Sequence, residues 1–319
     1  MRVLALAPAY ADSPIDGLHV AVKRRWPDDV VLMGSGRVAP PGGVAAATLA
    51  SYDLVLMADP CRRGSEFWPV KGVNAQVKAV VLHDSCWGVT KQLTWAAEVG
   101  VNLILMRVKS DVSMVIEQTR GWDCPPSVQW QPFGFDPAVF SPSGDEERPV
   151  DVIITGHLGH VYPMREQATR ALRAAAAAGE FVLDDLTLHG CAHPTVTGAA
   201  FAARLARAKI AVVTSSKFHY VLMKYYEAPA CGCAMVCQRA SNGFKQFFTP
   251  YPNGEDCFAF DTVEEMLVQI RLLLADDAIR LSVAAAGQKH VHHMHTNQRR
   301  VDMLIGHVER MGVADGISE

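Results

Sequence analysis

The chain has 319 residues, half of them hydrophobic and a fifth charged, which excludes a disordered chain and is enough for two hydrophobic cores. Its 30 Lys and Arg residues against 33 Asp and Glu give a net charge of −3, which disfavours general attraction to nucleic acid or anionic lipid. No apolar run approaches the roughly 18 to 20 residues that cross a bilayer, and Pro8 interrupts the apolar start, so we expect a cytoplasmic protein without an export signal or membrane span.

Short runs of branched apolar residues recur through the first third of the chain, with helical patterns between them. Continuous runs of this kind are typical of buried parallel strands that helices cover on both faces. The runs are residues 3–7, 30–33, 53–58, 79–83 and 101–106. The first half therefore predicts a doubly wound α/β unit, whose ligands should bind in the loops beyond the carboxyl ends of the strands.

A segment rich in Pro, Gly and charge, residues 134–149, interrupts this pattern and predicts a linker. A second series of strand candidates follows it, at residues 150–156, 181–190, 209–215, 234–238 and 257–261. We therefore expect two Rossmann-like domains, residues 1–145 and 146–295. An amphipathic helix in residues 296–319 should pack on one domain or bridge both.

The segment 215–238 contains the first candidate for chemistry. Lys224 and Glu227 are three residues apart on a predicted helix, so they share one face. A carboxylate can accept both hydroxyls of a ribose, and an ammonium can offset the charge of a diphosphate. From residue types alone, a weak surface pair is the simpler interpretation.

Gly156 follows a predicted strand and precedes a predicted helix. At such a junction, backbone amides and a helix N-terminus can meet an anion. A tight turn without a ligand is the alternative interpretation.

Candidates for a second functional site lie in the first half. His83 and Asp84 end a predicted strand, where an imidazole or a carboxylate could take a proton from the acceptor of a group-transfer reaction. Alternatively, Asp84 caps the next helix and His83 packs in the sheet. Asp59, Arg62 and Arg63 also follow a strand and could hold an anionic acceptor, or they could form an exposed turn.

The cysteines and histidines do not predict a metal site. The eight cysteines include no C-x-x-C pair, so reduced thiols are expected, and Cys231, Cys233 and Cys237 lack the paired spacing of zinc ligands. In the histidine-rich segment 290–295, two adjacent histidines would point apart on a helix. We expect an exposed helix end or a donor-loop contact there.

The run KYYEAPACGCAMVC, residues 224–237, resembles the donor-site motif of the GT-B glycosyltransferases, and it is most similar to their spore-maturation-type class. The resemblance continues in the same order through a capped helix at Thr262, an A-x-x-G segment and an H-T-x-x-R tail that begins at His295. It covers the carboxyl-terminal half, and GFDPAVFSP resembles the segment that joins the two domains. The resemblance implies the GT-B fold, in which two Rossmann-like doubly wound domains face each other across a cleft.

The resemblance also implies roles for the donor-binding residues. Glu227 would hold the donor ribose, while Lys224 or Arg165 would face the diphosphate. The full donor-binding set comprises Gly156, His157, Arg165, His219, Lys224, Tyr225 and Glu227. His219 stands where many retaining enzymes of this fold have a glutamate, which leaves the retaining or inverting outcome open.

Together, these patterns predict a metal-independent glycosyltransferase that transfers a hexosyl or pentosyl group from a nucleotide diphosphate sugar and needs no other cofactor. The acceptor could be a glycan, a metabolite, a protein or a modified nucleic-acid base, with nucleic acid not favoured. The sequence specifies neither the donor sugar nor the oligomeric state. A nucleotide-sugar epimerase of the same fold and a non-catalytic two-domain binding protein are the alternatives.

Overall fold

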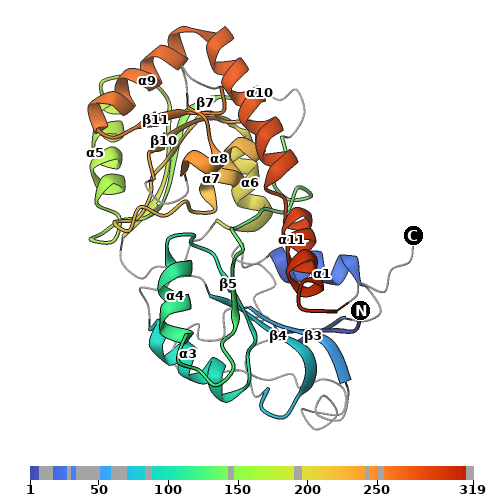
Figure 1. The fold of residues 1–319 in the computed structure, drawn as a ribbon. Helices are drawn as coiled ribbons and strands as arrows, with labels where there is room; N and C mark the ends of the chain where they lie inside the picture. The colour runs from blue at the N-terminus through green and yellow to red at the C-terminus, as the bar shows by residue number, and fades with distance from the viewer. Residues whose placement is uncertain are drawn as a thin grey trace. The chain divides into compact units, whose positions relative to one another are not determined.

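Figure 1 shows the computed structural model of the chain, which describes residues 1–6, 17–26, 30–33, 51–58, 70–82, 88–142, 147–189, 196–240, 244–250 and 255–313. The chain divides into two compact units. The first contains Met1–Phe133 and Asn297–Glu319, and the second is the continuous segment Gly134–Thr296. The carboxyl-terminal segment thus returns to the first unit.

The described part of the first unit contains a six-stranded parallel sheet in the order β2-β1-β3-β4-β5-β6. Its strands are β1 (Val3–Leu6), β2 (Val30–Met33), β3 (Ser51–Ala58), β4 (Asn74–Leu82), β5 (Leu103–Met106) and β6 (Ser127–Trp130). Its helices are α1 (Gly17–Arg25), α3 (Val89–Glu98), α4 (Asp111–Thr119) and α11 (Asn297–Glu309).

Helices cover both faces of this first sheet. Alternate residues of a strand point to opposite faces, so Val3 packs in one core with α1 and α11, and Leu4 packs in another with α3 and α4. Figure 1 shows the two helix pairs on opposite sides of the strands. The continuous apolar runs of the sequence arise from this two-sided burial.

The second unit contains a five-stranded parallel sheet in the order β11-β10-β9-β7-β8 among its described residues. Its strands are β7 (Val150–His157), β8 (Leu183–Leu188), β9 (Ala208–Val213), β10 (Ala234–Gln238) and β11 (Phe258–Phe260). Its helices are α5 (Pro163–Ala177), α6 (Gly198–Ala206), α7 (Lys224–Ala230), α8 (Phe244–Phe247), α9 (Val263–Ala275) and α10 (Asp277–Met294).

The helix α9 begins at the predicted capping box. Thr262 Oγ1 accepts a hydrogen bond from the Glu265 amide at 3.2 Å, and the Glu265 carboxylate accepts one from the Thr262 amide at 3.3 Å. One face of the sheet packs with α5, α9 and α10, in a core that includes Leu172, Ile270 and Val283. The predicted fold class, α/β with two doubly wound sheets, is confirmed. No helix within the described ranges is long and apolar enough to cross a membrane.

Candidate functional site

The candidate site lies at the carboxyl edge of the second sheet. The strands β7, β9 and β10 are parallel neighbours, so they end at the same edge, where ligands bind in open α/β sheets. The loops that follow β7 and β9 are joined by a hydrogen bond of 2.8 Å from the Lys217 amide to the Val161 carbonyl oxygen. Most of the predicted donor-binding residues lie on these elements and on α7, which precedes β10.

Gly156, the penultimate residue of β7, lies where two cationic side chains converge. Its φ of +113° is in the region that only glycine adopts readily. A Cβ atom at this position would collide with Lys224 Nζ and would lie 2.7 Å from an Arg165 guanidinium nitrogen. Both the backbone conformation and the close approach of the cations therefore require glycine.

Arg165, on the first turns of α5, is 3% exposed and bonded only to neutral groups. Its Nε donates to Thr214 Oγ1 at 2.9 Å, and its two Nη atoms donate to the carbonyl oxygens of His157 and Thr214 at 2.9 and 3.2 Å. The guanidinium also lies over the Tyr162 ring, 4.0 Å from its centroid. Burial lowers the pKa of Arg165 to about 10, so the group stays charged at neutral pH. No carboxylate of the described chain forms an ion pair with it.

Lys224 is the first residue of α7, and its side chain is partly buried. Burial lowers its pKa well below the usual value, and the charge of Arg165 adds to this effect, while Glu227 opposes it. The ammonium has neither a hydrogen bond nor an ion pair with the described residues. Two neighbouring basic groups, neither in an ion pair with a described carboxylate, make an anion the natural ligand here.

Glu227 lies one turn further along α7 and is 3% exposed. Burial raises the pKa of its carboxyl to about 7, although the nearby Lys224 acts in the opposite direction. Within the described ranges, the carboxyl makes no hydrogen bond or ion pair. The surface Lys–Glu pair that residue types alone suggest is therefore wrong.

The other predicted donor residues differ in their surroundings. His157 ends β7, and its Nδ1 is buried without a hydrogen-bond partner. His219 is exposed and has a positive φ of 55°, which is uncommon for a residue with a Cβ. Tyr225 is fully buried, and its hydroxyl donates to the Gln238 carbonyl oxygen at 2.7 Å. The Tyr225 hydroxyl is thus bonded within the protein, and a donor-binding role for this residue stays a prediction.

Sequence reasoning missed three polar residues of this edge. Thr214 and Ser215 follow β9 directly, and Gln238 is the last residue of β10. All three are buried, and they form hydrogen bonds with one another or with Arg165. The sequence signal that could have identified these residues is their position at the end of a buried apolar run or directly after it.

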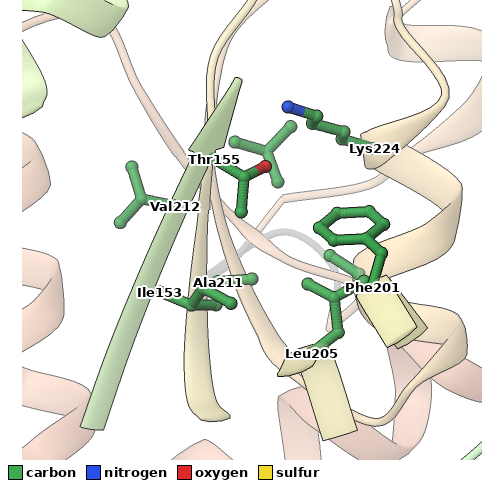
Figure 2. A pocket seen from close by; sticks show the side chains of 9 residues that line it. Ile153, Thr155, Phe201, Leu205, Ala211, Val212 and Lys224 are labelled. Atoms are coloured by element: carbon green, nitrogen blue, oxygen red, sulfur yellow. The ribbon is translucent and has the colours of Figure 1, made fainter. Parts of the chain in front are cut away.

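A small, mostly apolar cavity lies beneath Lys224, between the strands β7 and β9 and the helices α6 and α7. Figure 2 shows Ile153, Phe201 and Leu205 around its lower part, with the Thr155 hydroxyl and the Lys224 ammonium at its upper end. The aliphatic part of the Lys224 side chain thus lines the apolar cavity, and its ammonium group lies at the sheet edge.

The acceptor candidates of the first half, Asp59, Arg62, Arg63, His83 and Asp84, lie outside the described residues and stay predictions.

Within the described ranges, no group of three His, Cys, Asp or Glu residues is arranged to hold a metal ion. Cys231, Cys233 and Cys237 are all fully buried. Burial raises the pKa of Cys233 to about 11, so this thiol is protonated at neutral pH.

A comparison with protein families relates this site to sugar transfer. Residues 165–306 match the family described as glycosyl transferase-like, and this segment begins at Arg165 and includes Lys224 and Glu227. No curated protein sequence matches the chain.

Solved structures share the fold over nearly the whole chain. Sucrose-phosphate synthase (tll1590) from Thermosynechococcus elongatus is 12% identical and has a TM-score of 0.60, and the match covers 97% of this chain and 98% of that protein. Anabaena HepE (Alr3699), in complex with UDP and glucose, is 13% identical with a TM-score of 0.57, over 97% and 99% of the two chains. A glycosyltransferase from Rickettsia africae ESF-5 is 8% identical with a TM-score of 0.55, over 97% and 98%.

The chain therefore has the α/β fold of the GT-B glycosyltransferases, as the sequence resemblance implies. The family match and the fold together support glycosyl transfer as the class of reaction. The narrower resemblance to spore-maturation-type enzymes stays a prediction.

Proposed function

We propose that this chain is a glycosyltransferase that takes its sugar from a nucleoside diphosphate sugar and binds the diphosphate at the carboxyl edge of the second sheet. The observation that carries the proposal is the convergence of Arg165 and Lys224 on Gly156, while neither forms an ion pair with a described carboxylate. The complex of HepE with UDP and glucose, a protein of the same fold, supports a nucleoside diphosphate as the anion.

The chemistry follows from where charge develops. When the bond between the sugar and the diphosphate breaks, negative charge accumulates on the departing diphosphate. Fixed positive groups in a partly buried site stabilise that charge without reorganising, and such stabilisation often contributes more to catalysis than any other effect. Arg165 is held by three hydrogen bonds and is therefore pre-oriented for this role. The two side-chain cations supply positive charge of the kind that a metal ion brings in other enzymes.

Glu227 would accept hydrogen bonds from the donor ribose. Its carboxyl is buried, and its pKa of about 7 means that ionisation is unfavourable in the empty site. Two ribose hydroxyls would replace the lost solvation of the carboxylate and favour its charged form. In the first unit, Asp84 or His83 would take the acceptor proton if the reaction inverts the anomeric centre.

Calorimetry tests the proposal. Titration with UDP, GDP, TDP and CDP should identify one diphosphate that binds, and Glu227→Ala should weaken its binding at least about tenfold through loss of the ribose contacts. Lys224→Ala should chiefly lower turnover of the corresponding nucleotide sugar. Absence of binding by all four diphosphates at millimolar concentration, or unchanged affinity in Glu227→Ala, would contradict the proposal. A new sugar isomer formed from the donor alone would indicate an epimerase instead.

A further inference from the structure

Gln238 ends β10 and is 7% exposed. Its side-chain Oε1 accepts a hydrogen bond of 2.9 Å from the Ser215 amide, and its backbone carbonyl accepts one of 2.7 Å from the Tyr225 hydroxyl. The two bonds connect the end of β10 to the loop after β9 and to α7. Ser215 lies 23 residues before Gln238 in the sequence, and Tyr225 lies 13 residues before it.

Each partner of Gln238 is next in sequence to a residue of the cationic site. Ser215 follows Thr214, whose hydroxyl and carbonyl oxygens both accept hydrogen bonds from Arg165. Tyr225 follows Lys224 at the start of α7. Residue 238 therefore contacts the Arg165 side of the site through its side chain and the Lys224 side through its backbone carbonyl oxygen.

The bond to Ser215 is costly to remove. The Ser215 residue is 1% exposed, so its amide cannot bond to bulk water if Gln238 withdraws its oxygen. A buried donor left without a partner is strongly unfavourable, so we expect the backbone to shift until the amide finds another partner. A shift at Ser215 moves the adjacent Thr214, and with it both oxygens that orient the guanidinium.

We propose that Gln238 is a positioning residue, which sets the spacing of Arg165 and Lys224 and thereby the affinity for a diphosphate. The Gln238 side chain acts on Arg165 through Ser215, whereas the bond from Tyr225 goes to the backbone carbonyl oxygen of residue 238 and is kept in every variant. The inference rests on the proposed function, because it assumes that the two cations bind the diphosphate of the donor.

The test compares two variants of similar size. Gln238→Met removes the acceptor oxygen, and Gln238→Glu keeps one. By calorimetry, Gln238→Met should bind UDP about tenfold more weakly, with UMP affinity changed less than about threefold, because UMP lacks the second phosphate. Gln238→Glu should restore the ratio of UDP to UMP affinity to within about threefold of wild type. Val236→Ala, in the core of the same strand, should lower the melting temperature and leave this ratio unchanged.

A second readout does not depend on nucleotides. Hydrogen exchange of the Arg165 Nε–H group, followed by NMR, should be faster in Gln238→Met than in wild type, because its bond to Thr214 Oγ1 loosens. An unchanged UDP to UMP ratio together with unchanged exchange would overturn the inference. If wild type binds no diphosphate, the proposed function fails, and the exchange rate alone decides on Gln238. Gln238→Asn, whose shorter side chain also withdraws the acceptor, replaces Gln238→Met if that variant does not fold.

Discussion

In the second sheet, basic side chains at the amino end differ from those around Gly156 at the carboxyl end. At the amino end, basic side chains have partners. Lys209 forms an ion pair of 2.7 Å with Asp151, and Arg204 pairs with Asp184. Arg148 donates to two backbone carbonyl oxygens at 2.6 and 2.8 Å. These contacts join the beginnings of neighbouring strands and have an evident structural purpose.

At the carboxyl end, around Gly156, the same sheet carries two cations that no described carboxylate pairs with. Arg165 is oriented by neutral oxygens alone, and the pKa of Lys224 is lowered by burial and by its cationic neighbour. Such an arrangement lowers the stability of the free protein, and sites of this kind persist where function requires them. The comparison teaches that the two basic groups around Gly156 form no ion pair with a described carboxylate, which supports the proposal that an anion binds there.

The largest effect should come from exchanging one arginine at each end of the sheet. Arg165→Met should weaken UDP binding about 30- to 100-fold, since it removes a charge-assisted contact to the diphosphate. Arg148→Met should lower the free energy of unfolding by about 1 to 3 kcal/mol through loss of its carbonyl contacts, with UDP affinity unchanged. Calorimetry and urea unfolding measure the two quantities. Equal losses of affinity in both variants would erase the distinction between the ends.

A second effect concerns pH. Because burial raises the pKa of Glu227 from 4.5 to about 7, the folded protein retains a proton there that the unfolded chain has already released. The free energy of unfolding therefore falls as pH rises from about 4.5 to 7 and stays lowered above that range. Glu227→Gln removes this contribution, so the free protein should gain about 3 kcal/mol at pH 8 and little at pH 4.5.

Urea unfolding of wild type and Glu227→Gln at pH 5, 6, 7 and 8 measures this difference. A constant difference between the two proteins across the series would show that Glu227 does not titrate in this window.

The smallest expected effect is the difference between two glycine-to-alanine substitutions. It distinguishes strain in the backbone from displacement of the two cationic side chains. Gly156 and Gly159 both have a positive φ, at +113° and +126°, so alanine strains the backbone at either position. Only at Gly156 does a new Cβ collide with Lys224 and Arg165, whereas at Gly159 it meets nothing within 4 Å. Gly156→Ala should therefore weaken UDP binding about tenfold more than Gly159→Ala, at similar losses of stability. Equal affinities in a calorimetric titration would argue against the convergence of the cations on Gly156.

Much of the fold could be predicted because strands buried on both faces leave long apolar runs. The strand β6 (Ser127–Trp130) escaped prediction, since it is a short edge strand with polar residues at Ser127 and Gln129. The return of α11 to the first unit could not be foreseen either. An amphipathic helix shows that it has a buried face, and it does not show which core accepts that face.

The site was predictable only in part. Gly156 and Lys224 could be placed because a strand end and a helical spacing are local properties of the sequence. The link from Gln238 to Ser215 depends on β10 lying beside β9, and the order of strands in a sheet is a property of the tertiary structure. The surroundings of Tyr225 could not be predicted either, because a family motif does not reveal which side chains of the helix face the core.

The return of α11 also has a consequence for synthesis on the ribosome. Val301, Leu304 and Val308 of this helix are buried in the core that contains β1 and α1. Domains generally fold as units while the chain emerges, and the amino-terminal one usually comes first. Here the second unit is complete at Thr296, whereas the first still lacks part of its core until α11 has been made. We therefore expect the half of the protein that begins translation to be the half that finishes folding last.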